Sequence, residues 1–401
     1  MNAEKLIEFT NVNLFDGKHS EILPRVNVVI EENSGKIKLI AKEHCQLAYK
    51  RVDLHGKYMI PGLINAHTHI MMDPEKNKLE YLSETEVTVN ALNNLKKILR
   101  SGVTYIRDCG CAFNTDIKLA SLHVDGPQII ASGRPMTMTG GHADFVEGID
   151  GSVKWGHIVD SENEMRRCVR RQFKIGSKNI KVMATGGVMS ATDEVDDIEL
   201  SSGELKVAVS EAHSKHMTVA SHAQGNRGIQ ISLDAGVDSI EHGIYIDEKQ
   251  AEFMKRNQIY LVPTLNAPVS IAKYGVGKLP NYMLRKNDSV KEDFFKNVAM
   301  AIKRGVKVVV GTDAGTPYNT FETGTWQEIE LLYSLGATPA QALFGATSYA
   351  AELLKISADY GTLEPGKKAD FLVIDNNPLE DLTAIEQIDK LIFQNGKQVR
   401  I

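Results

Sequence analysis

Two histidines, His67 and His69, lie one residue apart at the end of an apolar segment that begins at Ile60. On a β-strand, side chains at positions i and i+2 project from the same face, so both imidazoles would point the same way. Neutral ring nitrogens are common metal ligands, and such a pair at a strand end favours a metal site. A single His-x-His pair also arises by chance on surfaces and in loops, so it gains weight only if further ligands occur downstream.

Further candidate ligands do occur, each in or directly after a later apolar segment. Taken singly, a strand-end histidine is often a satisfied polar residue, and a strand-end aspartate often caps the next helix. If the segments are parallel strands of one sheet, their ends lie together and these residues form one metal centre with the first pair. The further candidates are Lys181, His222, His242 and Asp313.

Lys181 lies between Ile180 and Val182, in the middle of an apolar segment. Burial lowers the pKa of an amine, and a neutral amine can add carbon dioxide to form a carbamate, an anionic metal ligand. The charges then suit two divalent cations. Carbamate, Asp313 and a bridging hydroxide offset three of the four positive charges, and four neutral histidines complete the shell. The alternative is a lysine whose ammonium reaches solvent at the rim of the sheet.

Short apolar segments alternate with amphipathic ones from residue 57 onward, which is the pattern of βα units on a parallel sheet. We therefore predict a (β/α)8 TIM barrel over residues 57–359, with the chemistry at the C-terminal strand ends. Both chain ends have strand-like texture, so residues 1–56 and 360–401 are predicted to pair into a small β-sandwich domain. The predicted barrel strands are 60–66, 103–108, 128–132, 179–184, 218–222, 239–242, 259–263 and 306–312, and the predicted helices are 84–100, 116–122, 162–175, 204–216, 226–235, 247–257, 287–304, 325–335, 339–346 and 348–354.

The composition limits the partners and the compartment. The 401 residues carry a formal net charge of -5 without a long run of one sign, which gives no electrostatic case for nucleic acid or an anionic membrane. The first residues lack the apolar core of a signal peptide, and no stretch approaches the ~20 apolar residues of a membrane span. Four scattered cysteines do not suggest a disulfide framework, so we expect a cytoplasmic protein with reduced thiols. Cys109 and Cys111 are either metal ligands or small packing residues.

The segments that carry these residues resemble the amidohydrolase superfamily, in its binuclear-metal branch with a carboxylated lysine. The similarity is greatest to the cytoplasmic prolidase-like and arginine-carboxypeptidase-like members, which are related to imidazolonepropionases, and it covers essentially the whole chain. The motifs are Pro61-Gly-Leu before His67-Thr-His69, Met138-Thr-Gly-Gly-His142-Ala-Asp144, Lys181 followed by Ala184-Thr-Gly-Gly-Val-Met-Ser190, His222, Glu241-His242-Gly, Gly311-Thr-Asp313-Ala-Gly, and Gly361-Thr-Leu-Glu-Pro-Gly-Lys-Lys-Ala-Asp370-Phe.

This resemblance implies a centre of two divalent metal ions. Zinc is the first candidate, and manganese, cobalt and iron also suit nitrogen and oxygen ligands. Asp313 would pass the proton of the bridging water to the leaving amine. His142 would hydrogen-bond the scissile carbonyl oxygen or its oxyanion, the alternative being an ordinary turn histidine. In the implied ligand set, His67, His69 and Asp313 hold the more buried ion, His222 and His242 hold the more exposed one, and Lys181, as N6-carboxylysine, bridges them.

The loop after Lys181 would line the substrate pocket with Gly187 and Val188. Relatives with prolidase-like activity often have a tyrosine after the fifth-strand histidine that contacts the substrate carboxylate, whereas this chain has Gln224 and Arg227 there. We expect one of these two residues to take over the contact, arginine through its bidentate fork. Arg227 is equally well interpreted as a surface residue at the start of a helix.

The resemblance predicts a metal-dependent hydrolase that cleaves the amide bond of dipeptides or N-acyl amino acids by a metal-bridged hydroxide. The alternatives are cyclic-amide hydrolysis, as in imidazolonepropionase- or hydantoinase-like relatives, and cleavage of aryl amides or carbamates. Deaminase relatives generally use one metal and lack the bridging lysine, and non-catalytic relatives lose metal ligands, so both are disfavoured. A homo-oligomer is expected, because related proteins commonly form one.

Overall fold

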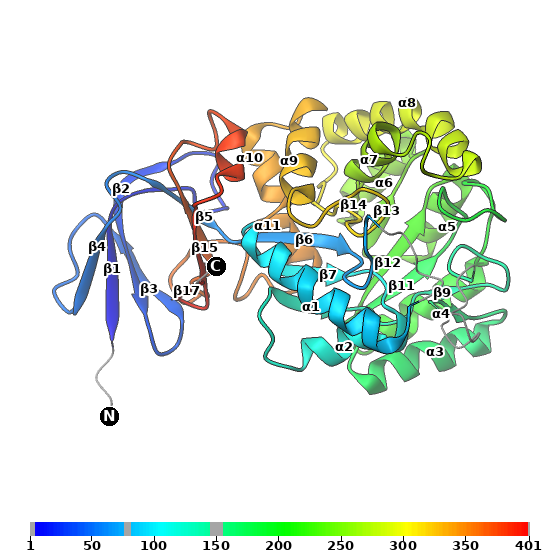
Figure 1. Cartoon of the computed structure of the whole chain (residues 1–401), viewed down its shortest axis with the longest axis horizontal. Helices are drawn as coiled ribbons and strands as arrows, with labels where there is room; N and C mark the ends of the chain where they lie inside the picture. Colours follow the sequence, from blue (N-terminus) through cyan, green and yellow to red (C-terminus); the bar gives the residue numbers. More distant parts are fainter. Residues whose placement is uncertain (1–4, 76–81, 145–154, 400–401) are drawn as a thin grey trace.

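A computed structural model of the chain describes residues 5–75, 82–144 and 155–399. Figure 1 shows a β-sheet at one end of the molecule and, beside it, parallel strands surrounded by helices. Residues 1–4 and 400–401 of the predicted small domain lie outside the described residues. Among the described helices, none combines the length and apolar character needed to cross a membrane.

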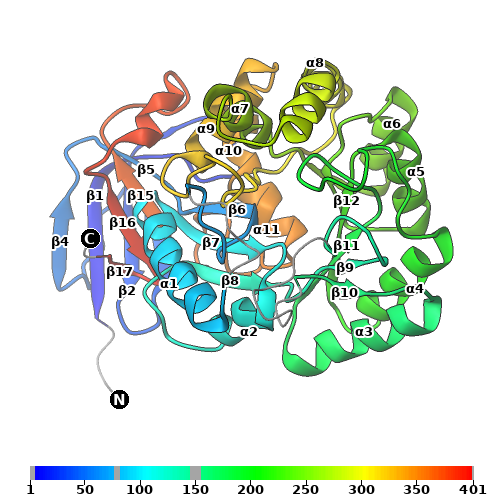
Figure 2. The same cartoon turned by 45° about the vertical axis from the view of Figure 1, so that its right-hand side comes forward.

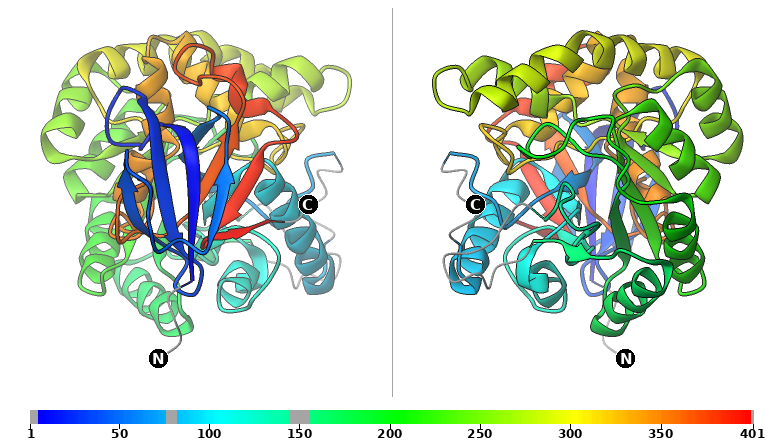
Figure 3. Two further views of the ribbon diagram at one scale, coloured as in Figure 1. Left: turned by 90° about the vertical axis from the view of Figure 1, so that its left-hand side faces the viewer. Right: turned by 90° about the vertical axis from the view of Figure 1, so that its right-hand side faces the viewer.

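The sheet at the end of the molecule is built from both ends of the chain. Its N-terminal strand β5 pairs antiparallel with the C-terminal strand β15, so that Tyr58 lies opposite Ile374. Figure 3 shows the blue and the orange-to-red strands side by side in this sheet. Its order is β17-β16-β15-β5-β1-β2-β3, with β4 paired to β1, and its strands are β1 (Leu6–Leu14), β2 (Leu23–Glu31), β3 (Lys36–Ala41), β4 (Lys50–Asp53), β5 (Tyr58–Pro61), β15 (Phe371–Ile374), β16 (Leu391–Gln394) and β17 (Lys397–Gln398).

Both faces of this terminal sheet are buried along β15, because successive side chains of a strand project to opposite faces. Phe371 and Val373 belong to an apolar cluster within the sheet region, whereas Leu372 and Ile374 belong to the main core of the molecule. The sequence of β15 is therefore apolar at every position and does not alternate between apolar and polar residues. The domain boundaries at 56 and 360 stay a prediction.

The rest of the fold is of the α/β class, as predicted, with two parallel sheets and helices around them (Figure 2). The smaller sheet has the order β6-β7-β8 and the larger one β10-β9-β11-β12-β13-β14. Their strands are β6 (Leu63–Thr68), β7 (Val103–Asp108), β8 (Gln128–Ala131), β9 (Met136–Thr137), β10 (His157–Ile158), β11 (Asn179–Met183), β12 (Thr218–Ala223), β13 (Ser239–His242) and β14 (Tyr260–Val262).

The predicted strand 306–312 is not a regular strand, but it joins the two sheets. The backbone N–H of Val309 donates to Leu261 O of β14 at 2.8 Å, and that of Ala66 in β6 donates to Val310 O at 2.8 Å. The N–H of Val310 bonds to Gly345 O instead of a strand partner, which interrupts the ladder. The segment nevertheless delivers Asp313 to β6, since its N–H donates to His67 O at 2.8 Å.

The predicted helices are all present with small shifts of their ends, but one helix was missed. Residues 266–274 form α7, and α8 begins at Asn281 rather than at 287. Pro268 lies in the first turn of α7, where a missing N–H costs nothing, and the N–H groups of Leu265 and Asn266 donate to the distant carboxylate of Glu328, at 2.8 Å each. The helices are α1 (Glu84–Arg100), α2 (Thr115–Ala120), α3 (Glu162–Ile175), α4 (Ser202–His213), α5 (Asn226–Ala235), α6 (Glu248–Asn257), α7 (Asn266–Tyr274), α8 (Asn281–Arg304), α9 (Gly324–Ser334), α10 (Pro339–Gly345) and α11 (Ser348–Leu353), with short 3-10 turns at η2 (Ala112–Asn114) and η3 (Leu382–Glu386).

Candidate active site

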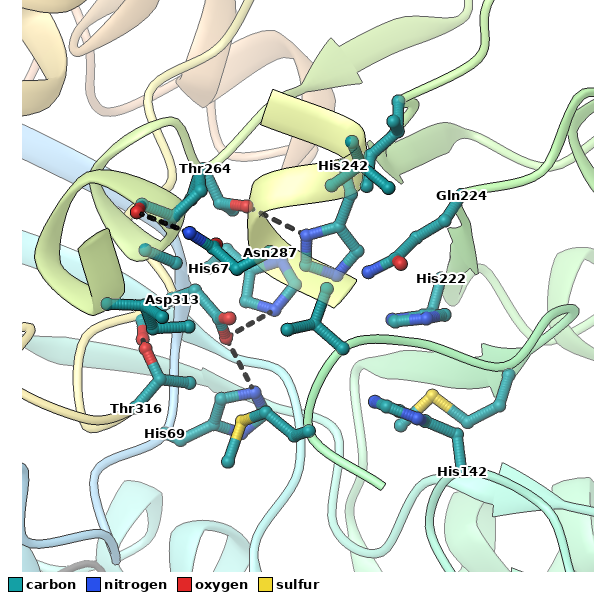
Figure 4. A pocket seen from close by; sticks show the side chains of 18 of the residues that line it. His67, His69, His142, His222, Gln224, His242, Thr264, Asn287, Asp313 and Thr316 are labelled. Carbon is teal, nitrogen blue, oxygen red and sulfur yellow. Dashed lines mark hydrogen bonds and ion pairs between the residues drawn. The ribbon is translucent and has the colours of Figure 1, made fainter. Parts of the chain in front are cut away.

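The two histidines of the first motif, at the end of β6, meet Asp313, which follows the irregular segment 306–312 (Figure 4). Oδ1 of Asp313 lies 3.1 Å from Nε2 of His69 and 3.4 Å from Nε2 of His67. The three potential ligand atoms lie within 4.8 Å of one another, which suits a single cation. Although burial alone would raise the pKa of Asp313, the imidazoles of His67 and His69 beside the carboxylate hold it well below its ordinary value.

His67 is oriented from behind by a buried carboxylate. Its Nδ1 lies 2.6 Å from Oε2 of Glu241, and Oε1 of Glu241 accepts a hydrogen bond of 2.7 Å from the buried guanidinium of Arg107. Burial alone would raise the pKa of Glu241, but Arg107 and His67 outweigh it and lower this pKa. Because a carboxylate only accepts, Nδ1 carries the proton of this contact and Nε2 is the nitrogen that can face a metal ion. Nε2 is buried and has no hydrogen-bond partner among the described residues.

Lys181 lies on β11, and its side chain is buried beside the histidines that follow on β12 and β13. Within the described part of the chain its Nζ has no hydrogen-bond partner, and burial lowers its pKa. Burial also holds the pKa values of His222 and His242 well below the ordinary value, so both rings are neutral donors of a lone pair. The rings of His222 and His242 lie 4.6 Å apart between centroids, and His67 lies 5.2 Å from His242. The imidazole nitrogens and the Asp313 carboxylate are ligands that fit divalent metal ions. The Lys181 amine lies beside them and is not an anionic ligand in this form.

Three non-glycine residues at this site have an unusual backbone conformation. Asp313, His242 and Thr264 have φ values of 58°, 67° and 59°, in the left-handed region that non-glycine residues seldom adopt. Thr264 Oγ1 shares a hydrogen bond of 2.7 Å with Nδ1 of His242, which fixes the ring. Strained residues of this kind persist where the surrounding structure holds functional groups in place.

These six residues form the base of a pocket with about 710 Å³ of empty space, part of it open to solvent. We call them the ligand cluster: His67, His69, Lys181, His222, His242 and Asp313. The other side of the pocket is hydrophobic and comes from the loop after β11, the turn after β13, α7 and α8. We call these residues the apolar wall: Val188, Met189, Ile244, Ala267, Pro268, Ile271, Val290 and Phe294.

The predicted pocket residues are placed differently from one another. His142 lines the pocket, and its ring stacks on His222 at 4.6 Å between centroids. Val188 and Gln224 also line it, and Gly187 lies against the His142 ring, where a Cβ would come within 2.4 Å of Cε1. Arg227 is exposed on α5 and is not among the lining residues, which favours the surface interpretation.

Sequence reasoning gave no role to several residues that support the site. Arg107 is a charged residue within the apolar strand β7, the same signal that singled out Lys181. Cys109, which the sequence marked as either a metal ligand or a packing residue, lies beside His67 and Glu241, and the three potential ligand atoms lie within 4.8 Å of one another. Asp193 and Lys286 have no comparable signal, since they lie in a loop and on a polar helix.

Comparison with known proteins identifies the family. Residues 58–399 match the amidohydrolase family over most of the chain. The chain belongs to the amidohydrolase family. Ochratoxinase of Aspergillus niger is 31% identical over 370 residues, which cover 84% of this amidohydrolase and 75% of that enzyme.

Solved structures agree with this assignment. A Xaa-Pro dipeptidase with bound methionine in its active site is 28% identical, with a TM-score of 0.90 over 98% of this amidohydrolase and 100% of the other chain. A putative prolidase from Bifidobacterium longum is 30% identical, with a TM-score of 0.83 over 99% and 95%. This amidohydrolase is therefore a hydrolytic enzyme that acts on amide bonds.

Proposed function

We propose that this amidohydrolase holds two divalent metal ions, with zinc as the first candidate, and that Lys181 is carboxylated and bridges them. The observation that carries the proposal is the Lys181 amine, which is buried and lacks a hydrogen-bond partner. A buried polar group without a partner is costly, whereas its carbamate is an anion that two cations would bind. The other ligands would be His67, His69 and Asp313 for the more buried ion, and His222 and His242 for the second.

When bound, the ions supply a water-derived nucleophile at neutral pH and Lewis acidity towards the carbonyl group. The carboxylate of Asp313 would accept the proton released by the attacking water and give it to the leaving amine. His142 would hydrogen-bond the carbonyl oxygen and stabilise the negative charge that develops there. The apolar wall would exclude water and hold the part of the substrate that does not react.

The proposed substrates are dipeptides or N-acyl amino acids, as in prolidase- and carboxypeptidase-like enzymes. Two similar structures, the Xaa-Pro dipeptidase and the putative prolidase, support this choice by their names. The apolar wall suits a hydrophobic side chain or acyl group. Gln224, which lines the pocket, is the proposed contact of the substrate carboxylate, in place of the exposed Arg227.

A second candidate is the hydrolysis of cyclic amides, aryl amides or carbamates. The 31% identity to ochratoxinase favours it, and so does the pocket composition. Among the described residues that line the pocket, none is an arginine, so a substrate carboxylate would lack a bidentate cationic partner.

The experiment that tests the function is a library of dipeptides, N-acyl amino acids, hydantoins, aryl amides and carbamates, assayed with metal-reconstituted enzyme. Turnover confined to the first two classes supports the proposal, and turnover confined to the last three replaces it with the second candidate. Within the first two classes, Gln224→Ala is expected to raise KM several-fold for substrates with a free carboxylate. Arg227→Ala, the matched control on the next helix, should leave KM unchanged, and the reverse result would reassign the contact to Arg227.

We further infer that the two parallel sheets and the segment 306–312 form a closed (β/α)8 barrel, and that the terminal sheet is a separate small domain. The backbone hydrogen bonds of 306–312 to β14 and β6 support the closure. All four cysteines are free thiols, three of them buried, which is in keeping with the reducing cytoplasm. A homo-oligomer stays a prediction.

A further inference from the structure

A buried lysine on α8 holds the loop that follows β11. Lys286 is 1% exposed, and its ammonium donates to the carbonyl oxygens of Gly187 and Ser190 at 3.1 and 2.9 Å and to the carbonyl oxygen of Asp193. It also donates to Oδ1 of Asp193 at 3.1 Å. Four acceptors from one loop surround a single buried charge, so Lys286 fixes the path of residues 187–193.

The other carboxylate oxygen of Asp193 faces His142. Oδ2 lies 2.8 Å from Nδ1 of His142, and both side chains are buried. A carboxylate oxygen only accepts hydrogen bonds, so the proton of this contact belongs to Nδ1. Burial alone would raise the pKa of Asp193, but the hydrogen bond from His142 and the Lys286 ammonium outweigh it and lower this pKa.

The ring of His142 is held on its other sides as well. One face stacks on His222, and the Gly187 backbone lies so close that a Cβ there would clash with the ring. The backbone N–H of His142 donates to Oε1 of Glu199 at 2.5 Å. The ring is therefore fixed in its plane, and Asp193 decides which nitrogen carries the permanent proton.

We propose that Asp193 is the positioning residue of the amide hydrolysis, that it fixes the orientation of His142 and the proton on Nδ1, and that Lys286 holds Asp193 and the adjoining part of the apolar wall in register. The inference rests on the proposed function for its kinetic part only. With Nδ1–H committed to Asp193, Nε2 donates to the substrate oxygen only when it also carries a proton, and the carboxylate opposite then stabilises the positive charge of the imidazolium ring, as in other Asp–His pairs.

The chain contains a matched control for this network. Glu194 and Arg285 are the neighbours of Asp193 and Lys286 in sequence and join the same loop to the same helix at 2.8 Å, but both are exposed. Glu194→Gln therefore breaks an ion pair between the same two segments without touching His142. Exposed pairs contribute little to stability, so this variant should behave like the unmodified enzyme.

The decisive variant is Asp193→Asn, because its amide has one acceptor and one donor end. Lys286 only donates, so the amide oxygen must face Lys286 and the NH2 group must face Nδ1 of His142. Nδ1 then accepts this hydrogen bond and carries no proton, so the ring is neutral and Nε2 becomes the weaker donor of an uncharged ring. Nitrogen NMR of histidine-labelled holoenzyme, assigned with His142→Gln, is expected to show Nδ1 protonated in the unmodified enzyme and in Glu194→Gln, and unprotonated in Asp193→Asn. An unprotonated Nδ1 in the unmodified enzyme, or the same pattern in all three, would overturn the proposal without any substrate.

The kinetic test uses the best substrate of the amide library. Asp193→Asn should lower kcat at least about tenfold with KM within about threefold, since the contact weakened is the one made to the developing oxyanion. An effect no larger than that of Glu194→Gln shows that Asp193 does not position the reacting group. If no amide is cleaved by any form, the proposed function fails and the NMR result alone decides the positioning.

A second variant covers the case in which Asp193→Asn does not fold. Lys286→Met leaves the carboxylate of Asp193 in place, so Nδ1 of His142 stays protonated. It removes the anchor of the loop that carries Val188 and Met189, so kcat should fall and KM should rise more for bulky apolar substrates than for small ones. Kinetics equal to those of the unmodified enzyme would contradict the role given to Lys286.

Discussion

The ligand cluster and the apolar wall face each other across one pocket, yet they are built in different ways. Most of the cluster comes from parallel strands, and the acidic side chains in and behind it are paired. Asp313 in the cluster and Glu241 behind it both have lowered pKa values, because imidazoles and Arg107 outweigh their burial. Beside His142, at the edge of the pocket, Glu199 accepts hydrogen bonds from the His142 N–H and the Thr137 hydroxyl, and burial raises its pKa to about 7.

This difference indicates that the ligand cluster determines the activity and the apolar wall determines the substrate preference. Strand ends are held by backbone ladders on both sides, so they position charged groups rigidly enough for metal ligation. The wall comes from a loop and two helices, elements that vary more among related proteins and decide what fits. Variants on the two sides should therefore change different quantities, activity on one and preference on the other.

The largest effect is expected for Lys181→Met. Without an amine that can be carboxylated, the cluster loses its bridging anion, so we expect fewer than two bound metal ions per chain and a fall in kcat of about 10³-fold or more. Metal analysis and steady-state kinetics measure both quantities. Lys178→Met, an exposed lysine at the start of the same segment, is the control. If Lys181→Met still bound two metal ions per chain, the role given to Lys181 in the ligand cluster would be wrong.

Glu241→Gln tests the support behind the cluster. Outer groups that orient a ligating histidine are typically worth about 10- to 100-fold in metal affinity or activity, and the same loss is expected here. Arg107 would be left as a buried charge without its carboxylate, at a cost of about 3–5 kcal/mol in stability. In thermal unfolding, Glu241→Gln should lose more stability than the control Glu211→Gln, which breaks a partly exposed ion pair with Arg170. Equal melting temperatures for the two variants would show that the buried pair carries no special weight.

On the wall, Ile271→Ala should change substrate preference. Ile271 faces the pocket from α7, whereas Val269 lies on the other side of the same helix. Removing this apolar contact is expected to raise KM about tenfold for substrates with bulky apolar groups and much less for small ones, with kcat nearly constant. Val269→Ala should leave the preference as it is. If kcat fell equally for all substrates, Ile271 would affect the catalytic step and not the substrate preference.

The smallest effect concerns Glu199 and is seen in stability. The folded protein binds its proton up to about pH 7, while the unfolded chain releases it near the ordinary value of 4.5. Stability therefore falls as pH rises through this window, by at most about 3 kcal/mol. Glu199→Gln should flatten this decline in denaturant titrations between pH 5 and 8, whereas Glu194→Gln should keep it. If stability declined with pH equally steeply in Glu199→Gln, Glu199 would not differ from the paired carboxylates of Asp313 and Glu241.

The sequence predicted the ligand cluster better than it predicted the apolar wall. Ligand candidates such as His67 and Asp313 were recognisable because strand periodicity and parallel strand ends confine them to one edge, whatever the loops do. The helix α7 was not, because its first N–H groups bond to Glu328, more than fifty residues away in the chain. Arg227 shows the same limit, since the direction of a side chain in the first turn of α5 depends on how that helix packs, and Arg227 is exposed.

The pairing of β5 with β15 has a consequence for how the molecule is made. During synthesis the first five strands leave the ribosome long before their C-terminal partners exist, and Met59 and Ile60 then have no covering strand on that edge. Folding of this sheet must wait until β15 has been synthesised, so it is slow and exposed to aggregation in the meantime. A chain cut short before Phe371 would keep every metal ligand and still leave an apolar sheet edge open to other chains.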